Sequence, residues 1–249
     1  MARGKFLTDM KKGLIAVQYW EGDKKKAMHL ARLIADIEPL HRDDVDFVFI
    51  ARADCEHDQA SVDHVLRKFN VKKLKCMARA TGHPWGCWVL WFSLLEWVYH
   101  MRAANKIPAY EWIFPFEADC VPMTKNWIND CHEEFLRQKS MLVGAEWLHG
   151  YHHINGNMMV SGNLQFLKWL VMGVTMNGVP RAEPWDVYLF PKFSQWGVGF
   201  SDKFLNAYAT RTLSREEYAK LQEQGLVWLH GVKDDSAAHW ARESLVKNH

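Results

Sequence analysis

The sequence has few cysteines and almost no net charge, and each shortage excludes a class of protein. Its 249 residues include five cysteines, none of them arranged as Cys-x-x-Cys. We therefore expect reduced, mostly buried thiols rather than a disulfide framework or a zinc ribbon. Lysine and arginine total 31 against 29 acidic residues, a formal net charge of +2. Such a balance creates no strong field that would draw the whole chain to nucleic acid or to an anionic membrane.

Long apolar runs and linker-like segments are also missing. The longest uncharged stretch, residues 80–95, contains His83 and Pro84 and is too short to span a bilayer, so we expect no membrane-spanning helix. The apolar run at 14–17 is too brief for the core of a signal peptide, which predicts a cytoplasmic protein. Without a tract rich in Pro, Gly or Ser and without a repeat of fixed period, residues 1–249 are expected to form a single domain.

Tryptophan and histidine are abundant, with 13 residues of each. Indole rings fill a core or present a flat surface to a ligand. Since 49% of the residues are hydrophobic, the chain can build one sizeable core, and most of the tryptophans are expected to lie in it. A few remain available as stacking surfaces for a sugar or a base.

Short β-rich runs alternate with segments of helical periodicity over the first half of the chain. The expected strands are residues 14–20, 46–51, 71–77 and 110–116, and the expected helices are 24–37, 58–69 and 87–104. This alternation predicts an α/β fold with one Rossmann-like, mostly parallel sheet flanked by helices, which binds ligands at the carboxyl ends of its strands. A helix at 127–138 and a strand at 141–145 follow, and residues 146–163 are expected to be rich in loops.

Two carboxylates, Glu117 and Asp119, directly follow the apolar strand at 110–116. In an extended backbone, residues two apart point to the same side, so this pair could approach one divalent ion, or one ion and a ribose hydroxyl. The ligand expected for such a pair is a hard cation that bridges a diphosphate. Acidic pairs are also common in solvated loops, which is the alternative interpretation of this segment taken alone.

A second motif, Trp228-Leu-His230-Gly231-Val-Lys233, lies near the end of the chain. Together with the Glu-x-Asp segment it resembles the nucleotide-sugar glycosyltransferases of the GT-A fold. The resemblance covers most of the chain in the order of elements, but only these two motifs in residues, and Glu117 stands where the family more often has Asp. It implies residues 1–119 as a nucleotide-binding half and residues 120–249 as a less regular acceptor half.

The resemblance also implies roles for the residues of the two motifs. Asp119 and His230 would ligate Mn²⁺ or Mg²⁺, and the imidazole favours Mn²⁺ because Mg²⁺ prefers oxygen ligands. Glu117 would contact the ribose or a metal-bound water. Lys233 would face the leaving diphosphate and stabilise its charge.

Further nucleotide contacts are expected after the first two strands. Gln18 and Tyr19 end the first strand and Arg52 and Asp54 follow the second, at the positions where this fold holds the base and the ribose. The ring of Tyr19 could stack on uracil. Arg79, in the turn before the long apolar helix, could meet a phosphate at the helix N-terminus, although a plain tight turn is the alternative.

The second half offers candidates for the acceptor side. His153 and Asn155 are read as sugar contacts, with a plain polar loop as the alternative. Trp147, Trp185 and Trp196 are expected to be the most exposed indoles because Gly, Pro or charged neighbours surround them, and Trp185 is assigned to the acceptor wall. Asp186 is the candidate general base, with a helix N-cap as the alternative.

These features predict a metal-dependent glycosyltransferase that moves a sugar from a nucleotide sugar, UDP-linked as the first guess, to an acceptor hydroxyl. The acceptor could be a saccharide, a protein or a hydroxymethylated DNA base, as for phage-type transferases. A nucleotidyltransferase of related fold stays open, although Glu21-Gly22-Asp23 does not supply its usual Gly-rich basic loop. A non-catalytic carbohydrate- or nucleic-acid-binding protein stays open as well. The sequence fixes neither the oligomeric state nor whether transfer inverts or retains the anomeric configuration.

Overall fold

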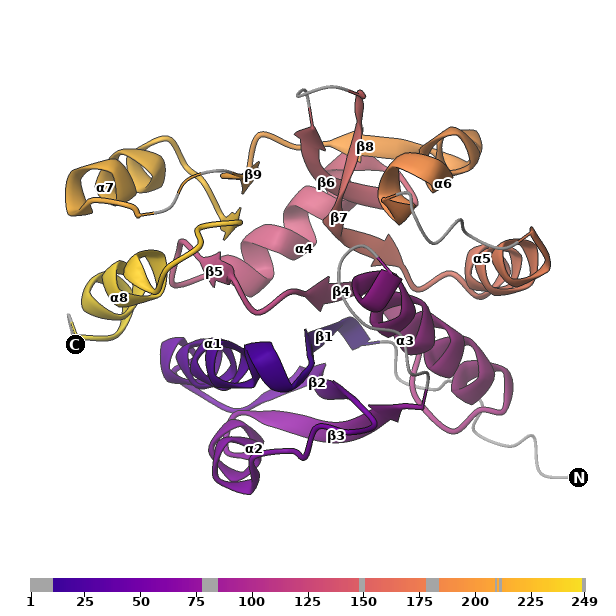
Figure 1. Cartoon of the computed structure of the whole chain (residues 1–249), viewed down its shortest axis with the longest axis horizontal. Coiled ribbons are helices and arrows are strands. Elements are labelled where there is room, and N and C mark those ends of the chain that lie inside the picture. The colour runs from indigo at the N-terminus through magenta and orange to yellow at the C-terminus, as the bar shows by residue number, and fades with distance from the viewer. Residues whose placement is uncertain are drawn as a thin grey trace, which may run out of the picture.

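A seven-stranded sheet forms the centre of the protein, which we analysed as a computed structural model describing residues 11–77, 85–147, 151–177, 184–208, 210 and 212–247. The strand order is β3-β2-β1-β4-β7-β6-β8 (Figure 1). The strands are β1 (Lys11–Tyr19), β2 (Arg42–Arg52), β3 (Phe69–Cys76), β4 (Tyr110–Phe116), β6 (Leu142–Trp147), β7 (His153–Ser161) and β8 (Val198–Phe200). β1 to β4 are parallel, and β7 is antiparallel to both β4 and β6.

A second, three-stranded sheet joins distant parts of the chain. It has the order β5-β10-β9, built from β5 (Cys120–Pro122), β10 (Trp228–His230) and β9 (Phe204–Asn206). β5 comes directly after β4 and its turn, and it pairs antiparallel with β10 so that Cys120 lies opposite His230. This register brings the two motifs of the sequence to the same place.

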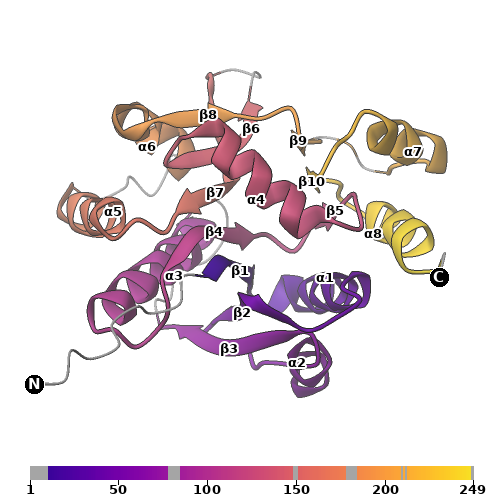
Figure 2. The ribbon, with the colours of Figure 1, turned by 180° about the vertical axis from the view of Figure 1, so that it is seen from behind.

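The two faces of the large sheet are covered by α1 (Lys24–Ile37), α2 (Gln59–Leu66), α3 (Trp85–Ala103), α4 (Trp127–Gln138), α5 (Leu164–Asn177) and α6 (Trp185–Phe193). Beside the small sheet lie α7 (Arg215–Glu223) and α8 (Ser236–Ala241) (Figure 1). Short turns of 3-10 helix lie at Glu21–Asp23 and Ser194–Trp196, and a π-helical turn lies at Arg242–Val246. Figure 1 shows α3 in front of the sheet, and Figure 2 shows α4 in front when the molecule is seen from behind.

The two faces arise from strand alternation, because successive side chains of a strand point to opposite sides. On one side Ile15 and Val17 of β1 pack in the core that includes residues of α1, α2 and α4. On the other side Leu14 and Ala16 pack in the core that includes residues of α3, α5 and α6. A strand buried on both faces reads as a continuous apolar run, which is why the sequence signals β1, β2 and β4 strongly.

The structure confirms the mostly parallel α/β sheet and corrects one segment. The expected helices 24–37 and 127–138 and the strand 110–116 coincide with α1, α4 and β4. The expectation of a loop-rich segment at 146–163 was wrong, because β7 lies there between β4 and β6. Its polar first half concealed a strand whose backbone pairs with a neighbour on each side. Over the described ranges, no helix is both long and apolar enough to cross a membrane.

Close backbone packing at the end of β7 gives a test of the fold. A Cβ added at Gly162 would lie 2.0 Å from the carbonyl oxygen of Tyr110, whereas a Cβ at Gly173 on α5 would meet Nε1 of Trp169 at an ordinary 3.8 Å. We predict that Gly162→Ala lowers the free energy of unfolding by about 2–3 kcal/mol, because the backbone must shift. Gly173→Ala is expected to raise it by roughly 0.5–1 kcal/mol. Equal urea midpoints for the two variants would contradict this packing.

Candidate active site

The acidic turn after β4 and His230 at the end of β10 meet in space. The turn is closed by the backbone N–H of Cys120, which donates to the carbonyl oxygen of Glu117 (3.2 Å). The Nε2 atom of His230 lies 3.2 Å from Oδ1 of Asp119 and 3.3 Å from Oε2 of Glu117. A turn, rather than the extended backbone expected from the sequence, thus aims both carboxylates at one imidazole.

The residues after His230 return the chain to the same carboxylates. Gly231 has φ of +95°, in the region that favours glycine, and its N–H donates to the carbonyl oxygen of Asp119 (3.3 Å). A Cβ there would also come within 2.9 Å of Oδ1 of Asn206. Beyond this bend Lys233 extends its ammonium to Oδ2 of Asp119 (3.0 Å). The bend at Gly231 therefore explains why Lys233, three residues after His230, reaches the same carboxylate.

Opposite charges dominate the electrostatics of this cluster. Burial lowers the pKa of His230, but its contacts with Asp119 and Glu117 outweigh burial and raise the pKa to about 9. Burial raises the pKa of Asp119, yet His230 and Lys233 hold it well below the ordinary range. The site thus places two cationic side chains against two carboxylates.

The cluster fits a divalent cation. Both ring nitrogens of His230 are buried, and neither is aligned for a hydrogen bond with any residue in the described part of the chain. The ligand atoms of Asp119, Cys120 and His230 lie within 4.8 Å of one another. Cys120, however, donates its thiol to Oδ1 of Asn157 (3.2 Å), and burial raises its pKa well above the usual value, so it stays a neutral thiol. The donors that remain are carboxylate oxygens and one imidazole nitrogen, a set that Mn²⁺ accepts.

Asn157 of β7 supports the acidic turn, a role that the sequence did not indicate. Its Oδ1 accepts from the backbone N–H of Glu117 (2.9 Å) as well as from the thiol of Cys120. A buried amide that fixes the start of the turn sets the direction of the carboxylates. Short polar strand residues carry no pattern that marks such a contact, so sequence reasoning had no signal for it.

The predicted nucleotide contacts lie at the carboxyl ends of β1 and β2. Gln18 is buried, and its Oε1 has no partner within the described residues. Arg52 and Asp54 pair with each other at 2.6 Å. Arg79 lies outside the described residues.

The stacking role expected for Tyr19 was wrong. Its side chain is 1% exposed and its hydroxyl shares a hydrogen bond with Nδ1 of His57 (2.6 Å), so no ring face is free for a base. Burial also raises the pKa of the Tyr19 phenol, which stays neutral. The exposed ring at this strand end belongs to Trp20, which is 45% exposed, and the guanidinium of Arg52 lies 5.5 Å from its centroid.

Asp186 lies in the first turn of α6 and faces β7. Its carboxylate accepts from the backbone N–H of Gly156 (3.0 Å) and of Val187 (3.1 Å), and Nε2 of His153 lies 3.7 Å away. Burial raises the pKa of Asp186, while His153 and the backbone donors oppose that rise. The N-cap position belongs to Pro184, so the capping alternative for Asp186 does not hold.

The other acceptor candidates differ in accessibility. His153 is buried, and its Nδ1–H donates to the carbonyl oxygen of Tyr151 (2.6 Å). Asn155 is half-buried and accepts from the N–H of Asn157 (3.0 Å). The expectation of an exposed Trp185 was wrong: it is 5% exposed, and its ring centroid lies 4.3 Å from that of Trp91. The first turn of α6 directs this indole into the core, although proline and aspartate flank it in the sequence.

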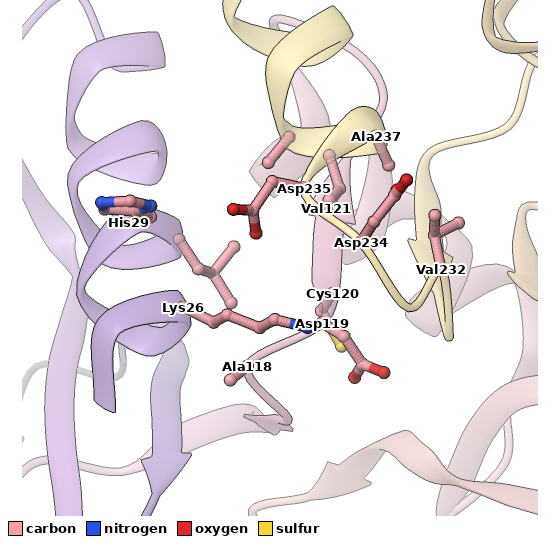
Figure 3. A pocket seen from close by; sticks show the side chains of 12 residues that line it. Lys26, His29, Ala118, Asp119, Cys120, Val121, Val232, Asp234, Asp235 and Ala237 are labelled. Atoms are coloured by element: carbon pink, nitrogen blue, oxygen red, sulfur yellow. The ribbon is translucent and has the colours of Figure 1, made fainter. Parts of the chain in front are cut away.

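A small hollow beside the acidic turn lies between α1 and α8. Figure 3 shows Lys26 extending from α1 toward the segment of Ala118, Asp119 and Cys120, with Asp235 on the opposite side. The ammonium of Lys26 donates to the carbonyl oxygen of Lys233 (2.8 Å). This contact ties the first helix of the chain to the segment that follows the His-Gly bend.

No family model and no curated protein matches the sequence. Solved structures do match its fold. The apo form of the glycosyltransferase GlyE from Streptococcus pneumoniae TIGR4 aligns with a TM-score of 0.55 and 11% identity over 91% of this chain and 56% of that one. The bifunctional glycosyltransferase WbbM, also in its apo form, aligns with a TM-score of 0.58 and 9% identity over 95% of this chain and 50% of that one.

The chain has a GT-A glycosyltransferase fold. It spans about half the length of each of these two structures, 56% and 50%. At such low identity the likeness shows the fold alone, and fold does not fix function. Activity must be argued from the residues at the carboxyl end of β4.

The charge state of His230 predicts how the metal-free protein responds to pH. Because the folded pKa of about 9 lies above the ordinary histidine value of 6.5, the cationic form stabilises the fold fully below about pH 6.5. That contribution, at most about 3 kcal/mol, is lost as the pH rises toward 9. We predict that urea unfolding with EDTA shows falling stability over this range, and that His230→Gln removes the fall. His100→Gln, which changes an exposed histidine of α3, is the matched control. An unchanged slope in His230→Gln would refute the assignment.

Proposed function

We propose that the protein is a metal-dependent glycosyltransferase that moves a sugar from a nucleotide sugar to an acceptor hydroxyl. The observation that carries this proposal is the convergence of Glu117, Asp119 and His230 at the carboxyl end of β4 in a GT-A fold. In open α/β sheets, ligands bind at this edge of the sheet. UDP is the first candidate for the nucleotide.

Asp119 and His230 would hold the cation, Mn²⁺ before Mg²⁺, with Glu117 beside it or on the ribose. When bound, the cation supplies positive charge to the diphosphate of the donor. Lys233, already paired with Asp119, adds a second positive charge on the same side. This arrangement suits a leaving group that gains negative charge as the reaction proceeds.

The nucleoside would lie over the carboxyl ends of β1, β2 and β4. Gln18 offers a buried amide oxygen without a partner in the described structure, and Arg52 and Asp54 offer a charged pair at the rim. Trp20, rather than Tyr19, would stack on the base, since the ring of Trp20 is the exposed one. Arg79 stays a proposed phosphate contact from the sequence. Residues 1–119, together with His230 and Lys233, would thus serve the donor, and the rest of residues 120–249 would serve the acceptor.

In the transfer, the bond between the anomeric carbon and the diphosphate oxygen breaks, and its electron pair leaves with the nucleoside diphosphate. A bond forms between the anomeric carbon and the acceptor oxygen, whose proton must be removed. Asp186 is the proposed base, since burial raises its pKa toward the range in which a carboxylate takes up a proton readily. His153, whose Nε2 lies 3.7 Å away, would position this carboxylate. Asn155 and His153 stay the proposed polar contacts of the acceptor side.

Nucleotide binding tests the proposed function. We predict that titration of UDP by calorimetry shows an affinity that depends on Mn²⁺, and that Asp119→Asn lowers it by at least about 100-fold because a metal ligand is lost. Asp43→Asn, which changes an exposed carboxylate, should leave the affinity within twofold. If Asp119→Asn keeps the manganese-dependent affinity, the metal assignment fails. Binding of UDP without any metal dependence would favour a non-catalytic binding protein.

A second variant tests the base. We predict that Asp186→Asn lowers kcat by roughly 100-fold. It also lowers stability by about 1–3 kcal/mol, because an amide cannot accept from both backbone donors as the carboxylate does. The wild-type kcat should fall with decreasing pH above the ordinary range of an aspartate, and the variant should lack this acid limb. Asp58→Asn, which changes a carboxylate that caps α2, separates lost stability from lost catalysis.

Near-normal kcat in Asp186→Asn would show that this carboxylate only fixes the junction of α6 and β7. Transfer with retention of configuration does not require such a base. The anomeric configuration of the product, determined by nuclear magnetic resonance, distinguishes this route from a different base.

A further inference from the structure

Lys26, in the first turn of α1, holds the backbone of Lys233. Its ammonium donates to the carbonyl oxygen of Lys233 (2.8 Å), although the two residues are 207 positions apart. The backbone N–H of Lys233 donates to the carbonyl oxygen of Thr210 (3.2 Å). Both backbone polar groups of Lys233 are thus held by other segments, and its side chain extends from this fixed point to Oδ2 of Asp119 (3.0 Å).

Close packing does not hold this segment against α1. A hollow of about 20 Å³ lies between them, which is room for a single water molecule. Lys26 and Leu30 line the hollow from α1, and Val232 and Asp235 line it from the segment that leads into α8 (Figure 3). The hydrogen bond of Lys26 therefore joins two parts of the chain that are not fully packed together.

The ammonium of Lys26 holds a backbone rather than a side chain. Asp234 and Asp235 line the same hollow, yet Lys26 forms no ion pair with a carboxylate in the described part of the chain. Asp234 instead accepts from the hydroxyl and the backbone N–H of Ser236. A charge-assisted hydrogen bond to a carbonyl oxygen constrains where the chain runs. Here it constrains the point from which the side chain of Lys233 starts.

The position of the Lys233 ammonium depends on that starting point. The side chain is 50% exposed and its four-carbon stem is flexible, so packing does little to fix it. It is fixed by the anchored backbone at one end and by the carboxylate of Asp119 at the other. A cation bound to Asp119 would compete for that carboxylate. The backbone anchor would then be what keeps Lys233 in place.

We propose that Lys26 is a positioning residue for Lys233. By holding the carbonyl oxygen of Lys233, it keeps the ammonium of that residue beside Asp119, where the diphosphate of the donor would bind. The inference rests on the proposed function, because it takes Lys233 to face the diphosphate. A fixed positive charge stabilises a developing negative charge better than one that must first be brought into place. Lys26 acts through Lys233 and needs no contact of its own with the nucleotide.

A double-mutant cycle on UDP binding tests this role, with affinities measured by calorimetry on the full chain at saturating Mn²⁺. Lys26→Met removes the donor but keeps most of the side chain. We expect it to lower the affinity for UDP about tenfold, because Lys233 loses its anchor. Lys233→Met should lower the affinity about 30-fold, because a charged contact with the diphosphate is lost. The double variant should match Lys233→Met within about twofold, because no ammonium is left to position.

Two further variants control for charge and for folding. Lys25→Met removes the same charge from the neighbouring, exposed residue of α1, and it should leave the UDP affinity within about twofold of the wild type. Lys26→Arg keeps a cationic donor at this position and should retain most of the affinity. Lys26 is only partly buried, so Lys26→Met and Lys25→Met should unfold at the same urea concentration.

The outcomes separate this inference from the proposed function. Absence of a manganese-dependent UDP affinity in the wild type would overturn both. With that affinity intact, an unchanged affinity in Lys26→Met, or an equal loss in Lys25→Met, would overturn the positioning role alone. The same holds if adding Lys26→Met to Lys233→Met costs a further tenfold in affinity. Lys26 would then act on the nucleotide directly or through the fold, since a merely structural role lowers the affinity in both backgrounds.

Discussion

The antiparallel pairing of β5 with β10 is the constraint on which the rest of the site depends. It joins residues that are more than a hundred positions apart and places Cys120 opposite His230. Strands of three residues have little stability of their own. Here β10 is held by Trp228, whose ring lies 4.1 Å from that of Phe116 and 5.2 Å from that of Trp127. Aromatic packing at the end of β4 therefore fixes the register that aims His230 at the acidic turn.

Once that register is fixed, the charges follow from the backbone. Asp119 leads into β5, His230 ends β10, and the left-handed bend at Gly231 brings Lys233 back to the same carboxylate. Both cations approach Asp119, so the fold concentrates charge before any ligand arrives. Preorganised charge of this kind is what stabilises developing negative charge on a leaving diphosphate. In the proposed function, this arrangement is what would let a chain with a net charge of only +2 bind a diphosphate locally.

The sequence predicts the fold better than it predicts the site, and particular residues show why. β1, β2 and β4 are buried on both faces, so their apolar runs mark them as strands. β7 escaped notice because His153, Asn155 and Asn157 are polar, and they are polar where the strand lines the candidate site. When only the sequence pattern is available, polar strand residues that line a site are interpreted as a loop.

Side-chain direction at the ends of elements was the second source of error. Tyr19 and Trp20 are neighbours, and one step along a strand moves a ring from the core to solvent. Trp185 has proline and aspartate as neighbours, but its exposure depends on which face of α6 packs against α3. The ring of Trp147, at the end of β6, contacts that of Tyr208, just beyond β9, and no local spacing in the sequence predicts such a contact. The acidic motif and the histidine motif could be recognised in the sequence because the charged residues of each lie within four positions of one another.

The central claim is that Asp119 and His230 hold a cation that binds a nucleotide diphosphate. A crystal structure of the protein grown with UDP and Mn²⁺, with diffraction data collected at the manganese absorption edge, tests it most directly. The account predicts an anomalous peak in contact with both side chains and a nucleotide over the carboxyl ends of β1 and β4. A nucleotide bound there without manganese, or manganese bound away from Asp119 and His230, would contradict it.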